Sequence, residues 1–148
     1  MKIIALDIDG VLNREDGNHS SDHIDVDMVA SLNKVIKATG VKVVITSTWR
    51  ASMSKDDIQS HLNKFGFIGD IIGMTDDNAK SRFAQISDWM DDNGADDFVI
   101  LDDIDVFKGL RHIGAFVRMA NNHFFQTDKL VGLTDDIANK MIARLNNN

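Results

Sequence analysis

Two aspartates at alternate positions, Asp7 and Asp9, follow a short apolar run near the start of the chain, and Gly10 comes directly behind them. The run from Ile3 to Leu6 is rich in β-branched residues and stops abruptly at charge, which is typical of a buried strand. Two carboxylates at the end of such a strand repel each other and resist burial, so a cation is expected between them. Taken alone, the stretch also fits a strand that runs into an ordinary acidic turn, and only other parts of the chain can distinguish the two.

Polar residues that can do chemistry also come after two later apolar runs. Thr46 and Ser47 end the second run, and Asp102 and Asp103 end a third. In an open parallel sheet the carboxyl ends of the strands lie at one edge, where ligands bind. Four carboxylates at one edge would be severely destabilising unless a hard divalent cation joined them. Magnesium prefers such oxygen ligands and commonly completes its shell with water and substrate phosphate, so the pattern predicts a Mg²⁺ site.

Two basic residues, Lys80 and Arg82, stand at the start of the helix that precedes the Asp102–Asp103 pair. Hydroxyl groups, backbone N–H groups and a cation are the donors that phosphate oxygens require. Acids alone would indicate a structural ion. Acids together with hydroxyls and a cation indicate a metal and an oxyanion in one site, which is the equipment of phosphoryl transfer.

The elements that position these residues are strands alternating with helices. Apolar residues at three- and four-residue steps, such as Val29 and Leu32, mark the helices, and β-branched runs mark the strands. The predicted strands are 3–6, 41–45, 68–74, 98–101 and 123–126, and the predicted helices are 25–39, 54–65, 81–93 and 134–145. Residues 110–120 are expected to mix a short helix with loop.

This alternation predicts an α/β fold: a single Rossmann-like domain over residues 1–148, with an open, mainly parallel five-stranded sheet and helices on both faces. The length of 148 residues suits one domain with a core of its own. No repeat, low-complexity tract or linker interrupts the chain.

Composition narrows the functional classes. The chain has no cysteine, no apolar run of membrane-spanning length and no start resembling a signal peptide, so a cytoplasmic protein without disulfides or thiolate metal sites is expected. A net charge of −7 argues against a general nucleic-acid coat, because such binding neutralises many phosphates. One region is locally basic and is expected to be solvated surface or a small patch: Lys108, Arg111, His112, Arg118 and His123.

The ordered set of motifs resembles the haloacid dehalogenase (HAD) superfamily of phosphohydrolases. The matching features are the Asp-x-Asp-Gly-Val opening, the Thr/Ser after the second strand, the basic residue at a helix start and the later Asp-Asp pair. Further details resemble a small subgroup whose members are grouped with RNA-repair enzymes: Ser47-Thr48-Trp49-Arg50, Arg82-x-x-x-Ile86-x-x-Trp89, and Thr127-Asp128 followed by Val-Gly-Leu-Thr.

The resemblance implies a role for each candidate residue. Asp7 would be the nucleophile that forms an aspartyl-phosphate, and Asp9 would be the general acid and base while its backbone carbonyl binds magnesium. Thr46 and Ser47 would hold the phosphoryl group. Asp102 and Asp103 would complete the metal site, with Asp103 favoured as the direct ligand. The superfamily's usual lysine favours Lys80 as the phosphate-binding cation, whereas the helix pattern of the subgroup favours Arg82; Trp49 and Arg50 are possible substrate contacts.

Superfamily members often carry a cap domain, but both usual insertion places are short here, so a capless and open site is expected. Such a site favours a bulky substrate or closure by a partner subunit. The predicted activity is a Mg²⁺-dependent phosphatase acting on a nucleotide or polynucleotide end. Sugar phosphates and phosphoproteins are alternative substrates, and a receiver-like signalling module phosphorylated on aspartate is the alternative of another class. For Trp49, core packing and stacking on a substrate ring both remain open.

Overall fold

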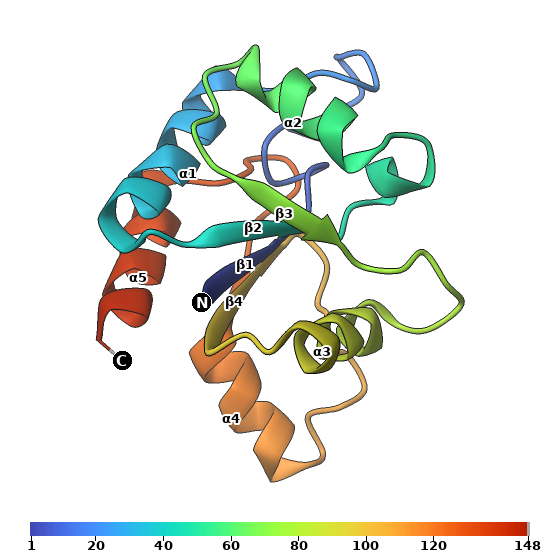
Figure 1. Cartoon of the computed structure of the whole chain (residues 1–148), viewed down its shortest axis with the longest axis vertical. Coiled ribbons are helices and arrows are strands. Elements are labelled where there is room, and N and C mark those ends of the chain that lie inside the picture. Colours follow the sequence, from blue (N-terminus) through green and yellow to red (C-terminus); the bar gives the residue numbers. More distant parts are fainter. Residues whose placement is uncertain (148) are drawn as a thin grey trace.

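The computed structural model describes residues 1–147, and at its centre lies one five-stranded sheet in the order β3-β2-β1-β4-β5 (Figure 1). The strands are β1 (Lys2–Leu6), β2 (Lys42–Ile45), β3 (Ile71–Met74), β4 (Asp97–Asp102) and β5 (Phe124–Gln126). Every neighbouring pair runs parallel. The predicted α/β fold with a five-stranded sheet is confirmed, and the sheet is parallel throughout.

The described residues form five α-helices and one short 3-10 helix, η1. They are α1 (Val26–Thr39), η1 (Thr48–Ala51), α2 (Lys55–Asn63), α3 (Arg82–Asn93), α4 (Gly114–His123) and α5 (Asp135–Asn146). The side chains of Asp25, Ser54, Ser81 and Thr134 each accept a backbone N–H at the start of α1, α2, α3 and α5. These caps satisfy donors that the first helical turn leaves free, and they explain why the predicted helix starts agree with the structure.

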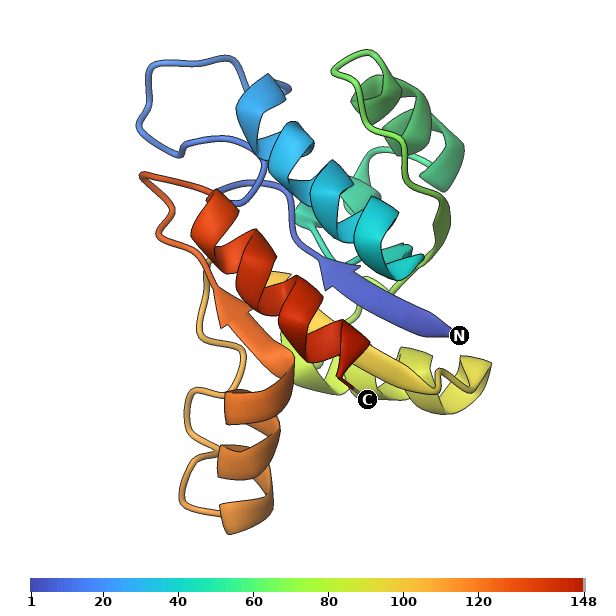
Figure 2. The same cartoon turned by 90° about the vertical axis from the view of Figure 1, so that its left-hand side faces the viewer.

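Two hydrophobic cores hold the helices against the sheet. Alternate strand residues such as Leu6 and Leu101 pack with α1, α2 and α5, whereas Ala5 and Ile100 pack with α3 and α4. The helices therefore cover both faces, as predicted (Figure 1). Figure 2 shows α1 and α5 side by side on one face, and the hydroxyl of Ser31 on α1 donates to Asp135 at the start of α5 (2.7 Å).

Three local predictions are corrected. Residues 68–70 are not in a strand, because the N–H groups of Ile68 and Ile71 donate to side chains of Asn33 and Gln59 instead of a neighbouring strand. Residues 110–120 mix turn and helix as expected, since residues 110–113 form turns and a bend and α4 begins at Gly114, but α4 extends through His123 into the predicted last strand. Its N-cap residue offers no side-chain hydrogen bond, so the sequence carries no start signal there. The turn η1 was also not predicted.

The strand order decides where a site can form. From the central strand β1 the chain proceeds to β2 on one side and later to β4 on the other, so a crevice opens at the carboxyl ends of these strands. The order also differs from the 2-1-3-4-5 order of receiver domains, which contradicts the receiver-like alternative. Within residues 1–147, no helix combines the length and the apolar composition that crossing a membrane requires.

Candidate active site

Three aspartates meet at the carboxyl edge of the sheet, where β1 and β4 are neighbours. Asp7 directly follows β1, Asp102 is the last residue of β4, and Asp103 comes next. The backbone N–H of Asp7 donates to the carbonyl of Leu101 (3.0 Å), which fixes the spacing of the two strand ends. One carboxylate oxygen from each aspartate lies within 4.8 Å of the others. The three form an acidic cluster, and both Asp7 and Asp102 are buried.

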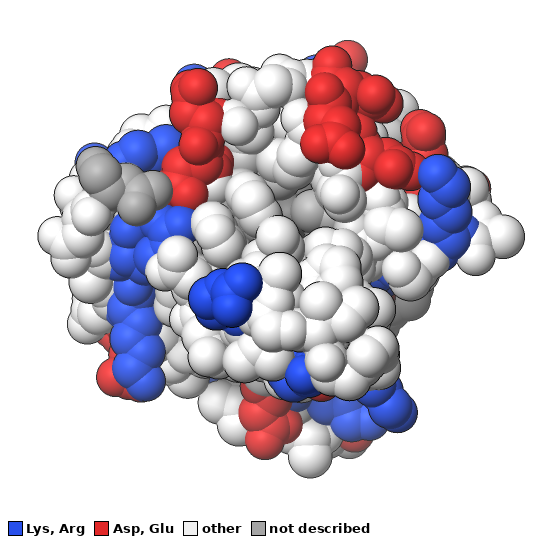
Figure 3. All heavy atoms as spheres, turned by 90° about the horizontal axis from the view of Figure 1, so that it is seen from below, with Lys and Arg blue, Asp and Glu red and all other residues white. Residues whose placement is uncertain are grey.

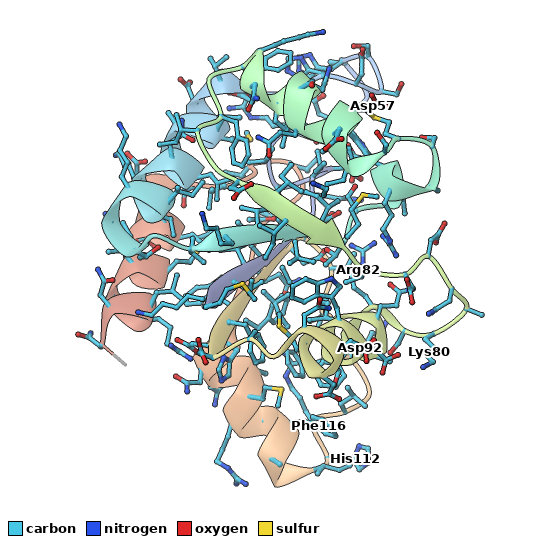
Figure 4. All side chains as sticks on the ribbon, viewed as in Figure 1. Asp57, Lys80, Arg82, Asp92, His112 and Phe116 are labelled. Atoms are coloured by element: carbon cyan, nitrogen blue, oxygen red, sulfur yellow. The ribbon has the colours of Figure 1, made fainter. Side chains whose placement is uncertain are left out.

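Arg82, the first residue of α3, supplies positive charge to the acidic cluster. Its Nη1 lies 2.9 Å from Oδ2 of Asp102 and 3.4 Å from Oδ1 of Asp7. Lys80 instead pairs with Asp88 at 2.6 Å, and both of these side chains are about half exposed. In Figure 4, Arg82 lies near the strand ends, whereas Lys80 lies on the outer side of the loop before α3. Of the two cations that the sequence left open, the structure brings Arg82 to the cluster and not Lys80.

The cluster carries more negative charge than Arg82 compensates. Burial, the charge of Asp102 and a hydrogen bond with Asp103 raise the pKa of Asp7 to about 9, against the opposing effect of Arg82. Burial also raises the pKa of Asp102, although Arg82 counteracts it. Burial disfavours the charge of Arg82, but the charge and hydrogen bond of Asp102, together with the charges of Asp7 and Asp103, outweigh this and raise the pKa of the guanidinium. A bound cation would relieve this excess of negative charge.

The carboxylate of Asp9 is held apart from the acidic cluster by two hydrogen bonds. Its Oδ2 accepts from the indole Nε1 of Trp49 (3.1 Å), and its Oδ1 accepts from Nδ2 of Asn13 (2.9 Å). The sequence predicted Asp9 in the site but gave no signal for its contact with Trp49, which lies 40 residues away on another element, whereas Asn13 lies only four residues away.

The hydroxyl groups after β2 are placed differently from one another. Thr46 is fully buried, and its Oγ1 has no hydrogen-bond partner among the described residues. Ser47 is also buried, and its Oγ accepts the N–H of Trp49 to cap η1 (3.2 Å). Thr48 is exposed and lines the cavity above Asp7. The hydroxyl of Thr46 is therefore a buried donor without a partner among the described residues at this strand end. Thr48 lines this cavity, although the sequence did not predict it there.

Trp49 and Arg50, the expected substrate contacts, are largely turned into the protein. Trp49 is 8% exposed. The Arg50 side chain is 4% exposed, and its guanidinium donates to the carbonyls of Thr46 and Ser47 and to Oε1 of Gln85 (2.9 Å). Arg50 therefore supports the turn after β2, and its role as a substrate contact stays a prediction.

A second layer of contacts, formed by residues outside the predicted site, holds the two acidic strand ends together. The hydroxyl of Thr127 donates to the carbonyl of Gly10 (2.7 Å), and its N–H donates to the carbonyl of Asp102 (3.0 Å). Gly10 has a φ of +79°, and a Cβ there would lie 2.6 Å from Oδ2 of Asp103. A side chain at Gly10 would therefore displace a cluster carboxylate. Thr127 directly follows β5, and this position after a strand is the sequence feature that could have predicted it near the site.

The acidic cluster opens into a cavity of about 290 Å³, which we call the carboxylate pocket. Its lining comes from several loops and consists of Asp7, Asp9, Glu15, Thr48, Arg82, Asp103, Ile104 and Lys129. Two further cavities, of about 380 and 310 Å³, also have Asp9 in their lining; the first is formed by the loop before α1 and the second by η1 with Ser21 and Asp22. Among the described residues only this loop follows β1, and only η1 and α2 lie between β2 and β3, so no inserted cap covers the pocket.

The donor set fits magnesium. Three carboxylates within 4.8 Å of one another offer the hard oxygen atoms that Mg²⁺ prefers. Asp103 is partly exposed and lines the pocket, whereas Asp102 is fully buried and already accepts from Arg82 and from the N–H of Ile104 (3.0 Å). Asp7 and Asp103 are therefore the cluster carboxylates that face an incoming ion. The side chain of Asp9 is not part of the cluster.

The locally basic region of the sequence lies partly on α4, and Figure 3 shows one face of the molecule by charge. There, Lys and Arg side chains occur in separate groups among uncharged and acidic ones. Arg111 pairs with Asp105 (2.6 Å), and Nδ1 of His123 lies 2.7 Å from the carbonyl oxygen of Phe98. These contacts fit a solvated surface.

Comparison with known proteins agrees with the geometry. Residues 3–138 match the family described as the HAD domain in Swiss Army Knife RNA repair proteins. The fold is similar to the solved structure of a Legionella pneumophila protein that carries a provisional assignment to subfamily III A of the HAD superfamily hydrolases. That similarity has a TM-score of 0.50 at 14% identity and covers 98% of this chain and 83% of the other. No curated protein matches the sequence significantly.

Proposed function

Since the chain belongs to the family of HAD domains in Swiss Army Knife RNA repair proteins, we propose that it is a Mg²⁺-dependent phosphomonoesterase that works through an aspartyl-phosphate on Asp7. The observation that carries this proposal is the acidic cluster. Asp7, Asp102 and Asp103 bring three carboxylate oxygens within 4.8 Å of one another, Asp7 and Asp103 line an open pocket, and the guanidinium of Arg82 lies beside them. A purely structural arrangement would gain nothing from burying uncompensated charge.

The proposed reaction uses Asp7 as nucleophile and Asp9 as general acid and base. An oxygen of the Asp7 carboxylate attacks phosphorus, the ester bond to the leaving oxygen breaks, and Asp9 gives that oxygen its proton. In the second half, Asp9 takes a proton from water, whose oxygen attacks phosphorus. The bond to Asp7 then breaks, inorganic phosphate leaves, and both residues return to their starting states.

The groups around Asp7 stabilise the transferring phosphoryl group. Arg82 lies 3.4 Å from Asp7 and can donate to phosphate oxygens with its remaining N–H groups. The unpartnered hydroxyl of Thr46 lies on the neighbouring strand end but is fully buried and outside the lining of the carboxylate pocket, whereas the exposed Thr48 lines the pocket and its hydroxyl can donate to a phosphoryl oxygen. Asp7 and Asp103 would hold Mg²⁺ together with the backbone carbonyl of Asp9. When bound, the ion supplies neutralisation of the charge on the phosphoryl oxygens.

The carboxylate pocket and the two cavities beside it support a substrate larger than a small metabolite. Two cavities continue from Asp9 beyond the carboxylate pocket, on the side where the leaving group must lie if Asp9 protonates it. A nucleotide or polynucleotide end is long enough to extend from the carboxylate pocket over these cavities and agrees with the family's association with RNA repair. We therefore place a phosphorylated nucleic-acid end first among substrates, ahead of sugar phosphates and phosphoproteins.

The test is phosphate release from a substrate panel, with and without Mg²⁺. The panel contains an aryl phosphate, mononucleotides, a sugar phosphate, a phosphopeptide, and oligonucleotides phosphorylated at either end. We expect Mg²⁺-dependent release that favours one oligonucleotide end. The Asp7→Asn variant should lose activity by about 10⁴-fold or more, because it lacks the nucleophile.

The outcomes separate the parts of the proposal. Release that favours mononucleotides, a sugar phosphate or a phosphopeptide would keep the phosphatase and discard the polynucleotide end. Wild-type-like activity of Asp7→Asn would reject the covalent mechanism. If no substrate releases phosphate in the presence of Mg²⁺, the proposed function itself is rejected.

A further inference from the structure

Both oxygens of the Asp9 carboxylate are occupied by donors from different parts of the chain. The indole N–H of Trp49 reaches Oδ2 (3.1 Å) and the amide of Asn13 reaches Oδ1 (2.9 Å). An aspartate side chain rotates about two bonds, and a single hydrogen bond leaves one of these rotations free. Two hydrogen bonds from opposite sides fix the plane of the carboxylate as well as its position.

The two donors are themselves held firmly. Asn13 is buried; its Oδ1 accepts the N–H of Gly10 (2.9 Å), and its Nδ2 also donates to the carbonyl of His23 (2.9 Å). Trp49 is 8% exposed and belongs to the hydrophobic core under α1 and α2. Its backbone N–H is bound by the Ser47 hydroxyl at the start of η1. Neither donor can follow Asp9 if it rotates, so both act as fixed points.

We propose that Trp49 and Asn13 are positioning residues that hold Asp9 in the orientation in which it transfers a proton to and from the leaving oxygen. The inference rests on the proposed phosphatase function. It assigns to Trp49 a role that neither core packing nor stacking on a substrate provides: the indole N–H acts through Asp9. Since Asp9 lines the carboxylate pocket and both adjoining cavities, its carboxylate stands where the phosphoryl group and the leaving group meet.

Positioning of a general acid has a kinetic signature that packing does not have. An aryl phosphate has a good leaving group that departs with little protonation, whereas an alkyl phosphomonoester needs the proton. Loss of Asp9 orientation should therefore lower kcat/KM for the alkyl ester much more than for the aryl ester. The quantity kcat/KM is the one to compare, because in a covalent two-step reaction it covers only the steps up to departure of the leaving group.

The test variant is Trp49→Phe, which keeps a buried aromatic ring and removes the N–H. The matched control is Trp89→Phe, the same change at the chain's other tryptophan, which lies on α3 against Gly73 and away from Asp9. With an alkyl phosphomonoester, Trp49→Phe should lose about tenfold or more in kcat/KM, within the range that general acid catalysis supplies. With an aryl phosphate the loss should be about twofold or less, and Trp89→Phe should match wild type on both.

A second arm asks whether Trp49 acts through Asp9. In an Asp9→Ala background, adding Trp49→Phe should cause no further loss with the alkyl ester. The contact itself is tested without activity: in Trp89→Phe, Trp49 is the only tryptophan, and its fluorescence emission should shift when Asp9→Ala is added.

Equal losses with both esters, or a loss that persists in the Asp9→Ala background, would show that Trp49 is only part of the core and would overturn the inference while leaving the phosphatase intact. An unchanged emission spectrum would overturn the contact, whatever the assays give. Absence of wild-type phosphate release from every ester would reject the proposed function, and this inference with it.

Discussion

Strand β4 begins and ends on a buried aspartate, and each of the two is bound by an arginine from a helix. At the start, Asp97 is held by Arg144 of α5 through two hydrogen bonds of 2.8 and 2.9 Å. At the end, Asp102 is held by Arg82 of α3 at 2.9 Å. The difference lies in the neighbours: the Asp102 site also contains Asp7 and Asp103, whereas at Asp97 the guanidinium faces one carboxylate.

The same pair of residue types therefore has opposite electrostatic outcomes. Burial alone would raise the pKa of Asp97, but the hydrogen bonds and charge of Arg144 outweigh it and hold the pKa below its ordinary value. At the other end, burial and the charge of Asp102 raise the pKa of Asp7 to about 9. One arginine for one carboxylate makes a structural ion pair. One arginine beside three carboxylates leaves excess negative charge that a bound cation would balance. Carboxyl groups with strongly shifted pKa values of this kind are typical of functional sites.

The first way to test this comparison is to make the same isosteric change at each of the two sites, at Asp97 and at Asp7 of the acidic cluster. Asp97→Asn should lower the free energy of unfolding by about 1.5–3 kcal/mol, because it removes a charge-assisted pair from a largely buried position. Its loss of stability should be confined to pH values above the folded pKa of Asp97, since below it the wild-type carboxyl is neutral too. Urea unfolding at pH 7 measures the effect. Unchanged stability would mean that this pair contributes nothing and would remove the contrast.

Asp7→Asn should have the opposite sign in protein without Mg²⁺. The pKa of Asp7 is about 9 in the folded protein and has an ordinary value of 3.8. Between these values the folded protein keeps a proton that the unfolded chain has lost, so the free energy of unfolding falls as pH rises, by at most about 1.4 kcal/mol per pH unit. Asp7→Asn has no proton to lose there. Urea unfolding from pH 5 to 8.5 should show the variant becoming more stable relative to wild type.

Magnesium provides the control for this experiment. Because the ion binds the deprotonated carboxylates, it should stabilise wild type more strongly as pH rises and stabilise Asp7→Asn much less. A wild-type stability that rises with pH in Mg²⁺-free buffer, or a wild type that loses no more stability than Asp7→Asn between pH 5 and pH 8, would contradict the charge imbalance at the acidic cluster.

The sequence was sufficient for the acidic cluster because parallel strands place their ends together. Once the runs before Asp7 and Asp102 are recognised as strands, the convergence of their carboxylates follows from topology alone. The helix starts followed in the same way from capping residues such as Ser81. In contrast, α4 begins at a residue that makes no side-chain cap, and so no start signal was present.

The partners of side chains could not be predicted in this way. Sequence spacing predicts which element a residue belongs to, but it does not fix where a long side chain points. The indole of Trp49 and the guanidinium of Arg50 are neighbours in sequence, yet one reaches Asp9 and the other lies beneath the strand end, bound to Gln85. Such contacts span 35 and 40 residues and depend on how η1 is packed, which no local pattern encodes.

Lys80→Gln has the smallest expected effect, and its comparison with the same change at Arg82 is the sharpest local test of the site. The two residues are separated by Ser81, the N-cap of α3, so Arg82 starts the helix that packs on the sheet while Lys80 remains on the loop outside it. Lys80→Gln should leave kcat/KM for phosphate release within about twofold of wild type, because its pair with Asp88 is an exposed one. The matched change Arg82→Gln should cost about 10²–10³-fold, as removal of a donor to the developing charge does. If Lys80→Gln is instead the damaging variant, the loop before α3 must fold inward over substrate, and the cation assigned to the acidic cluster would be the wrong one.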